Sequence, residues 1–303
     1  MLDPQRLRAL QAFAVRGTIA AAAESLGYSP AAVSQQLSAL ERETGTALFE
    51  RTARSVTLTP AGRALAERAG PILDALEDAR AEALAVAGST GGDIDVSTIP
   101  TAATVVAPAL TDLMAEHRGL HVALHQSGSA EALERLRTRE LDVAVVDAWH
   151  PGRQPELHVR LLARDPLVLA VPAEHPDAGR TTPIDLDRLA EAVEGRTWLF
   201  APVDQPSRTV AEEILAHSAA RPSATWEVEG LTTIGQLVAR RVGIALLPAL
   251  ALRDLSGSIG TVPLRPARHR KLLAVTRRGS QPHPAVAACL RAVRAADWTA
   301  TEK

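Results

Sequence analysis

The stretch that decides the N-terminal fold is residues 18–45, TIAAAAESLGYSPAAVSQQLSALERETG. Thr18 can cap a first helix, whose alanines are the strongest helix formers, and Gly27 can end it in the left-handed conformation. Ser29 and Pro30 then begin a second helix. Apolar residues recur at the spacing of buried helical faces, at Ala22, Leu26, Val33, Leu37 and Leu40. The stretch therefore predicts two packed helices joined by a tight turn.

The second of these helices also carries a polar face. Ser34, Gln35 and Ser38 are short polar side chains of the size that reaches base edges in a major groove. An earlier helix over residues 4–16, with apolar residues spaced by three, should cover the buried faces of the pair. Together these helices indicate a DNA-binding unit.

A change of period follows Gly45. Val56 and Leu58 alternate with polar residues as in a short strand, and Arg51 and Arg54 flank the turn before it. A two-stranded wing with these arginines at its tip would meet phosphates or the minor groove. The alternative interpretation is a solvated hairpin.

Composition limits the class of protein. A chain of 303 residues has room for two or three domains, and its net charge of −2 means that nucleic acid must be bound by a local patch. The lone Cys289 excludes an intramolecular disulfide and fits a reducing compartment. No apolar run is long enough to span a membrane, and the N-terminus lacks the charged-then-apolar pattern of a signal peptide, so we expect a soluble cytoplasmic protein.

A long helix is predicted from Thr59 to about Ala87. Its apolar residues alternate in steps of four and three, at Leu65, Ala69, Ile72, Leu76, Ala79, Ala83 and Val86. This is a heptad seam, which favours pairing with a second helix over packing on the helix's own domain. Gly70 and Pro71 should interrupt or kink the helix.

A flexible boundary at residues 88–92 separates this helix from an α/β region. Strands and helices alternate beyond it, and the apolar run 142–146 is typical of a buried parallel strand. We expect two α/β lobes with a cleft, crossed twice by the chain. The domain limits predicted are 1–60, 59–88 and 92–303, with lobe I at about 92–162 and 268–303 and lobe II at about 163–267.

Three predicted strand ends open helices near this cleft, where free N–H groups can bind an anion. The candidate effector-binding residues there are Ser97, Thr98, Ile99, Pro100, Thr101, Gly128, Ser129, Thr232 and Thr233. The hypothesis is a small anionic ligand. The alternative is that the hydroxyls are ordinary helix caps.

Other chemistry-bearing groups point to surface or core roles. His117, His121 and His125 lack a further ligand that would complete a metal site, and Cys289 fits a buried helix face. The basic cluster at 265–271 is interpreted as a solvated crossover loop, with a second nucleic-acid patch as the alternative. Phosphate-loop, nucleophile-elbow and zinc-protease motifs are missing, so we expect no catalysis, no metal and no cofactor.

Residues 4–64 resemble the winged helix-turn-helix domain of LysR-type transcriptional regulators. The motif residues that carry the resemblance are Leu7, Leu10, Gly17-Thr18, Ala21-Ala22, Leu26, Ser29-Pro30-Ala31, Val33-Ser34-Gln35-Gln36-Leu37, Leu40-Glu41, Gly45, Leu48-Phe49, Arg51, Arg54, Val56, Leu58-Thr59 and Ala61-Gly62. Segments 139–146, 167–172 with His175-Pro176, and 243–248 resemble the effector domain of that family, which is similar to periplasmic binding proteins. Arg240-Arg241 departs from the small residues common in the family.

This resemblance implies the roles of several residues. It places Thr18 near a phosphate and Ser29, Pro30, Ala31, Ser34, Gln35 and Ser38 against DNA. It also identifies the helix over 59–87 as the dimerisation element, through Leu65, Ala69, Ile72, Leu76, Ala79 and Ala83. The implied partners are double-stranded operator DNA, a small effector, a second copy of the chain in a homodimer or homotetramer, and RNA polymerase.

The charge of the N-terminal region favours binding by two copies. Residues 1–60 hold six arginines against five acidic residues, so one copy should bind DNA weakly. Two rival functions remain, a cytoplasmic small-molecule-binding module and an enzyme that uses the α/β cleft.

Overall fold

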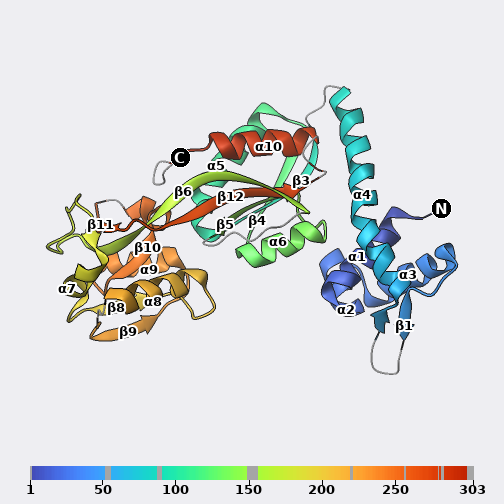
Figure 1. Cartoon of the computed structure of the whole chain (residues 1–303). Helices are drawn as coiled ribbons and strands as arrows, with labels where there is room; N and C mark the ends of the chain where they lie inside the picture. Colours follow the sequence, from blue (N-terminus) through green and yellow to red (C-terminus); the bar gives the residue numbers. More distant parts are fainter. Residues whose placement is uncertain are drawn as a thin grey trace.

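The computed structural model describes residues 2–51, 56–86, 91–148, 156–218, 221–255, 257–278, 280 and 283–298. Figure 1 shows a small helical domain at the N-terminus, one long helix, and a larger α/β domain made of two lobes. This is the mixed α/β architecture that the sequence predicts. The predicted boundary over residues 88–92 lies mostly outside the described residues.

The N-terminal domain is built from α1 (Pro4–Arg16), α2 (Ile19–Leu26) and α3 (Pro30–Thr44). The predicted caps are confirmed, because the Thr18 and Ser29 hydroxyls accept hydrogen bonds from the N–H groups of Ala21 and Ala32 at 3.1 and 3.2 Å. The glycines that follow α2 and α3 have φ angles of 67° and 68°. A residue without Cβ adopts this conformation at little cost, so each helix ends where its glycine stands.

A small antiparallel wing follows, made of β1 (Phe49–Arg51) and β2 (Val56–Leu58). The Phe49 ring packs edge to face on Phe13 with the ring centroids 5.3 Å apart, which ties the wing to α1. Glu41 of α3 accepts hydrogen bonds from the N–H groups of Leu48 and Phe49 at 2.9 and 3.1 Å. The wing is therefore held against the helices at its base.

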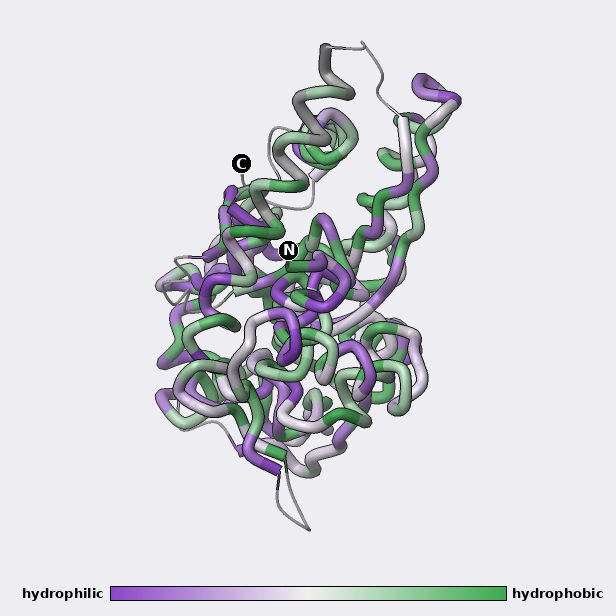
Figure 2. Tube along the Cα trace, turned by 90° about the vertical axis from the view of Figure 1, so that its right-hand side faces the viewer, coloured by the Kyte–Doolittle hydropathy of each residue, from purple (hydrophilic) through white to green (hydrophobic). Residues whose placement is uncertain are grey.

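Helix α4 (Pro60–Val86) connects the two domains. It runs through Pro71 without a break, so a helix that ends at Gly70 and Pro71 is excluded, whereas the predicted kink stays a prediction. Proline removes one N–H from the ladder, but packing against α1 supports this part of the helix, since Ala69 and Leu73 are buried there. Beyond that contact α4 extends away from the N-terminal domain, as Figures 1 and 2 show.

Lobe I contains β3 (Gly92–Thr98), η1 (Pro100–Ala102), α5 (Ala103–Glu116), β4 (Leu120–Gln126), α6 (Ser129–Arg137), β5 (Val143–Ala148), β12 (His269–Arg277) and α10 (Pro284–Ala295). The strand β6 (Leu157–Pro172) begins in this lobe and ends in the other. One hydrophobic core joins β3, β5 and β12 to α5 and α10. A smaller cluster packs α6 against the other face of the sheet.

Lobe II contains β7 (Ile184–Asp185), η2 (Leu186–Arg188), α7 (Leu189–Val193), β8 (Thr197–Phe200), α8 (Pro206–Ser218), β9 (Ala224–Glu227), α9 (Leu231–Ala239), β10 (Ala245–Pro248), η3 (Ala249–Leu255) and β11 (Ile259–Arg265). Two further hydrophobic clusters form its interior, one beneath α7 and α8 and one beneath α9. Each lobe thus has its own core.

The strands of the main sheet are ordered β4-β3-β5-β12-β6-β11-β7, with β10 also paired to β6. β3 pairs in parallel with β4 and β5, as strand–helix–strand units require. β6 pairs antiparallel with β12 in lobe I and with β10 and β11 in lobe II. The chain therefore leaves lobe I along β6 and returns from β11 into β12, which gives the two crossings expected from the sequence.

Candidate nucleic-acid interface and effector cleft

The polar face of α3 lies on the surface. Ser29, Pro30, Ala31 and Gln35 are exposed and Ser34 and Ser38 half-buried, while the buried side chains of the helix are Val33, Leu37 and Leu40. Thr18 is exposed as well. Because the two capping hydroxyls accept backbone N–H groups, their own O–H groups remain able to donate to phosphate oxygens.

Arg51 is the last described residue before the turn of the wing, and its side chain contacts α3. It ends β1, and its Nη2 donates to the Ser38 Oγ at 3.0 Å and lies 3.4 Å from Glu41 Oε2. The reason is that Glu41 is drawn to the base of the wing by two backbone N–H groups, so its carboxylate faces Arg51. Arg51 therefore joins the wing to α3. Arg54 lies outside the described residues.

The predicted seam of α4 is divided in two. Leu65 is partly buried and Ala69 fully buried against the N-terminal domain, so these two residues pack within their own chain. Ile72 and Leu76 are 38% and 49% exposed, and Ala79 and Ala83 are exposed too. The exposed stretch, Ile72, Leu76, Ala79 and Ala83, is called the α4 seam below.

The hydroxyls predicted to bind an anion in lobe I have partners within the protein. Ser97 and Thr98 are fully buried, and the Ser97 and Ser127 hydroxyls are hydrogen-bonded at 2.8 Å. Ile99 is buried as well. These side chains form the wall of lobe I rather than its surface, because their strand is covered on both faces.

Ser129 and Thr101 are also engaged. The Ser129 hydroxyl donates to Asp147 Oδ1 at 2.5 Å and accepts the N–H of Asp147 at 3.0 Å. Thr101 Oγ1 accepts from Arg270 Nη2 at 2.7 Å. Neither hydroxyl caps a helix, since the N-cap positions of η1 and α6 are Ile99 and Gly128. Pro100 and Gly128 are exposed, so they and Ser129 are the predicted residues of lobe I that a ligand can reach.

A buried arginine connects these groups. The Arg270 side chain is 1% exposed; its Nε donates to Asp165 Oδ2 at 2.8 Å and its Nη1 to Asp147 Oδ2 at 3.1 Å. Asp165 also accepts the N–H of Leu250 at 3.0 Å. Burial raises the pKa of the Asp165 carboxyl, and the Arg270 guanidinium opposes that rise.

The interpretation of residues 265–271 as a solvated loop fits the exposed residues 265–268 but is wrong for Arg270, which is buried in β12. Arg270 and Asp165 face each other in the β12–β6 register, at the place where the chain crosses between lobes. Sequence reasoning missed them because a basic run normally indicates a surface. The available signal was an aspartate followed closely by the apolar run 167–171.

Lobe II presents the first turn of α9. Gly230 precedes this helix with a φ of 87°, so no side chain caps the first N–H groups of α9. Thr232 and Thr233 are exposed. The free N–H groups and the positive end of the helix dipole remain available to an anion. The first turns of α6 in lobe I and α9 in lobe II therefore share this feature, since neither has a side-chain cap.

The remaining groups have structural roles. His125 Nε2 lies 3.1 Å from Asp95 Oδ1, and among the described residues no group of three or more candidate ligands could hold a metal ion. Cys289 is fully buried, and burial raises the pKa of its thiol to about 12. Within the described part of the chain, no helix has the length and apolar character needed to cross a membrane.

Two family models match the chain. Residues 4–63 match the bacterial regulatory helix-turn-helix protein model of the lysR family, and residues 87–298 match the LysR substrate binding domain. The chain belongs to the LysR family of transcriptional regulators. LysR regulators bind DNA through the first domain, bind small-molecule effectors through the second and form oligomers, so the predicted function and partners of this kind are confirmed.

Individual LysR relatives agree with this assignment. A probable hydrogen peroxide-inducible genes activator of Streptomyces viridosporus is 32% identical over 82% of this chain and 78% of its own length. The nitrogen assimilation regulatory protein nac of Escherichia coli is 28% identical over 80% of this chain and 77% of its own length.

Solved structures show the same fold for the whole LysR chain. A full-length OxyR variant of Pseudomonas aeruginosa has a TM-score of 0.68 and 22% identity, covering 99% of this chain and 97% of that one. A hydrogen peroxide-bound OxyR variant of Corynebacterium glutamicum has a TM-score of 0.57 and 25% identity over 96% and 91% of the two chains.

Proposed function

We propose that this LysR regulator binds operator DNA as a dimer, with the exposed polar face of α3 in the major groove. The observation that supports this most directly is the surface formed by Ser34, Gln35 and Ser38 on a helix whose other face is buried in the domain. The α4 seam would supply the second copy. Two α3 helices could then enter successive major grooves about one helical turn apart.

Operator binding by a Gln35→Ala variant tests this proposal. Gln35 is exposed on α3, so its removal should weaken binding to DNA from beside the protein's own gene by about 1–3 kcal/mol without unfolding the domain. A gel-shift titration measures the change. Glu24→Ala, an exposed change on α2, is the matched control and should leave the affinity unaltered. Equal affinity of the Gln35→Ala and wild-type proteins would refute the role of α3.

The effector proposed here carries an anionic group at one end and a hydrogen-bond donor at the other. The anionic end would meet the uncapped first turn of α9 at Thr232 and Thr233. The donor end would meet Asp147, whose side chain is 21% exposed, whereas the Arg270 that neutralises it is 1% exposed. An amino acid or a hydroxy acid has this chemistry, which refines the anionic effector predicted from the sequence.

Calorimetric screening of the whole protein tests the effector class. Amino acids and hydroxy acids should bind, and both Thr232→Val and Asp147→Asn should weaken the binding. Binding of cationic or wholly apolar compounds alone would rule the class out.

Cys289 argues against peroxide sensing by a thiol in this chain. The thiolate is the species that reacts with peroxide, and a fully buried thiol with a pKa of about 12 supplies almost none at neutral pH. The hydrogen peroxide in the name of the Streptomyces relative is therefore not carried over to this protein.

The location of the protein, a further partner and the absence of catalysis are inferred from the family and the composition. We place the protein in the cytoplasm, with RNA polymerase as a further partner and with no catalytic activity or cofactor. The absence of catalysis is supported by the two family models and by the named relatives, which are transcriptional regulators.

A further inference from the structure

The effector domain touches its own DNA-binding domain through the turn that follows α6. Arg16, at the end of α1, forms an ion pair with Glu140, with 3.1 Å between Arg16 Nη2 and Glu140 Oε1. Arg139 Nη2 donates to the carbonyl oxygen of Gly70 in α4 at 3.0 Å. These four residues, Arg16, Gly70, Arg139 and Glu140, are called the latch below.

The turn is built to hold these side chains in place. Glu140 also accepts from the Thr138 hydroxyl at 2.6 Å and lies 3.5 Å from Arg135. The buried Arg277 donates to the carbonyl of Leu141 and to Asp142. A carboxylate with several partners has one defined position, so Glu140 presents a fixed target to Arg16.

Arg139 has an unusual backbone conformation for an arginine. Its φ is 64°, in the left-handed region that glycine adopts most easily. A glycine there would form the turn with less strain, but it could not reach Gly70. The strain therefore accompanies the contact between the two domains, as it does at functional positions elsewhere.

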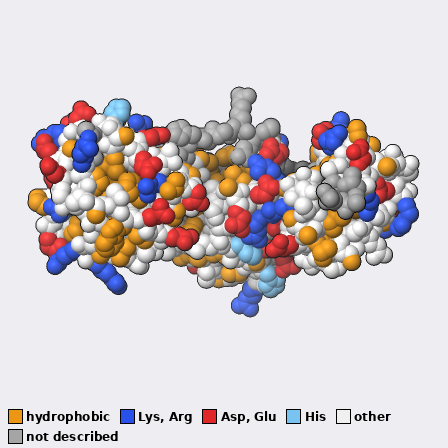
Figure 3. All heavy atoms as spheres, turned by 90° about the horizontal axis from the view of Figure 1, so that it is seen from below, with side chains coloured by type: hydrophobic (Ala, Val, Ile, Leu, Met, Phe, Trp, Pro, Cys, Tyr) orange, Lys and Arg blue, Asp and Glu red, His pale blue; other side chains and the backbone are white. Residues whose placement is uncertain are grey.

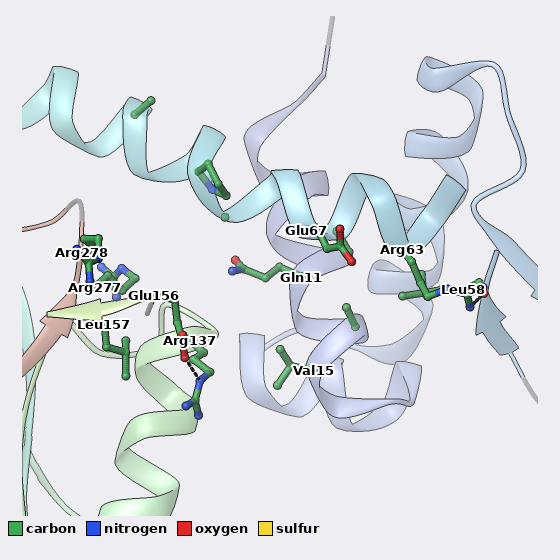
Figure 4. Close-up of a pocket in the computed structure, with 15 residues that line it drawn as sticks. Gln11, Val15, Leu58, Arg63, Glu67, Arg137, Glu156, Leu157, Arg277 and Arg278 are labelled. Carbon is green, nitrogen blue, oxygen red and sulfur yellow. Dashed lines mark hydrogen bonds and ion pairs between the residues drawn. The ribbon is translucent and has the colours of Figure 1, made fainter. Parts of the chain in front are cut away.

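Besides the latch, α10 of lobe I approaches α4, and the remainder of the contact is hollow. A cavity of about 880 Å³ separates the two domains. Figure 4 shows Gln11, Val15 and Glu67 on one side of it and Arg137, Glu156 and Leu157 on the other. An interface of a few polar contacts around a cavity can open at modest cost, unlike an interface with an apolar core.

Helix α6 connects the latch to the effector cleft. Ser129 in its first turn is hydrogen-bonded to Asp147, and its last turn leads into Arg139 and Glu140. Nine residues of helix span about 13 Å. Figure 1 shows α6 on the side of lobe I that faces the N-terminal domain, and Figure 3 shows acidic and basic side chains mixed on the surface between the two domains.

We propose that the latch is a releasable contact by which the effector domain sets the position of its own DNA-binding domain, and that α6 transmits a change at Asp147 to it. The second half rests on the proposed effector cleft. A ligand that draws Asp147 from Ser129 would shift α6 and so loosen the latch.

Spin-label distance measurements on the full chain test this proposal. Exposed Glu24 and Asp112 are replaced by cysteine and labelled, while the buried Cys289 stays unlabelled. An excess of unlabelled protein keeps one labelled subunit per oligomer. The native latch should give one narrow distance distribution, and Arg16→Glu, which sets two carboxylates against each other, should broaden and shift it.

Two further variants keep the test decisive. Glu140→Arg and Arg135→Glu, added together to Arg16→Glu, restore opposite charges in both ion pairs of the turn and should restore the narrow distribution. Arg139→Gly keeps the φ of the turn, removes the contact to Gly70 and should broaden the distribution even if Arg16→Glu fails to fold. The control is Arg188→Glu, at an exposed ion pair of lobe II. A wild-type distribution in Arg139→Gly, or an unrestored one in the charge swap, would overturn the latch.

The link to the cleft has its own variant. Ser129→Ala removes both hydrogen bonds to Asp147 while Arg270 stays paired, and it should broaden the distribution as Arg139→Gly does; an unchanged distribution would overturn transmission through α6. The measurement uses neither DNA nor effector, so its failure is distinguishable from failure of operator binding.

Discussion

Arg270 is a buried charged side chain whose ion pairs join strands of the effector domain. It is buried at the crossing between the lobes, with Asp165 and Asp147 as its ionic partners. Burial of a charge is costly unless the charge is paired. Removing one partner therefore destabilises a protein more than replacing the whole pair with apolar residues.

Replacement of Arg270 should therefore destabilise the effector domain strongly. Arg270→Met leaves the Asp165 carboxylate buried without its guanidinium, and we expect the free energy of unfolding to fall by about 3–5 kcal/mol in urea titrations. Adding Asp165→Asn, which keeps an acceptor for Leu250, should recover part of the loss. Arg188→Met at the exposed pair with Glu191 should cost at most about 1 kcal/mol. Equal losses in the two arginine variants would contradict this account.

A buried histidine predicts a pH dependence of stability. His175 is 8% exposed, and its Nδ1 accepts the N–H of Asp177 at 3.1 Å, which requires that nitrogen to be unprotonated. Burial lowers the pKa of His175, and Arg196 lowers it further. The unfolded chain therefore binds the proton more readily than the folded one.

The sign of the effect follows from that difference. The contribution of His175 is complete at pH values above its ordinary pKa of 6.5 and is lost as pH falls through and below that value. His175→Asn keeps an acceptor near Nδ1 and should flatten the decline in unfolding free energy on the acid side. The exposed His121→Asn should keep the wild-type slope. A slope unchanged by His175→Asn would show that another group causes the decline.

At the residue scale, sequence reasoning located surfaces better than buried charges. It placed the polar face of α3 on the surface because helical period separates that face from the apolar one. It missed Arg270 because the partner, Asp165, lies over one hundred residues away and faces it only once β6 and β12 are in register. It expected free hydroxyls at the cleft, because the sequence does not show that the Ser129 hydroxyl is hydrogen-bonded to Asp147.

At the element scale, helices with capping residues could be predicted almost to the residue. α2 and α3 begin at Thr18 and Ser29 because those hydroxyls take the first free N–H groups. The strand β11 has no clear signal in the sequence, because it contains Gly260 and Pro263, which normally mark breaks. Gly260 is needed there, since a Cβ would lie 2.4 Å from Ala178. The first half of β6 has no alternating pattern of apolar burial, since Val159 and Leu161 are exposed there.

The junction between the wing and α4 also depends on a glycine. A Cβ on Gly62 would lie 2.1 Å from the backbone oxygen of Leu48. Gly62→Ala should therefore push α4 from the wing and lower the stability of the N-terminal domain by about 1–3 kcal/mol, with loss of operator affinity. Gly179→Ala, where a Cβ meets no atom within 4 Å, is the control. Urea titration and gel shift check both variants, and a fully stable Gly62→Ala protein would contradict the packing described here.

At the scale of the whole molecule, the charge balance makes association important. The six arginines and five acidic residues of region 1–60 give one DNA-binding domain little electrostatic affinity. Two domains on one operator combine their binding energies, since the second binds at a high effective concentration. Operator affinity should then depend on residues that touch no DNA.

The α4 seam is where this dependence can be tested. Leu76 is 49% exposed on the seam, and Glu67 lies nine residues earlier, two and a half helical turns away, on the opposite face. Leu76→Lys places a charge in the paired helices and should shift the protein toward monomer in sedimentation, with a loss of operator affinity that a high protein concentration recovers. Glu67→Lys changes the charge on the other face and should leave the protein associated. If Leu76→Lys stays associated and binds its operator normally, the chains are joined elsewhere, and α4 serves only to connect the two domains.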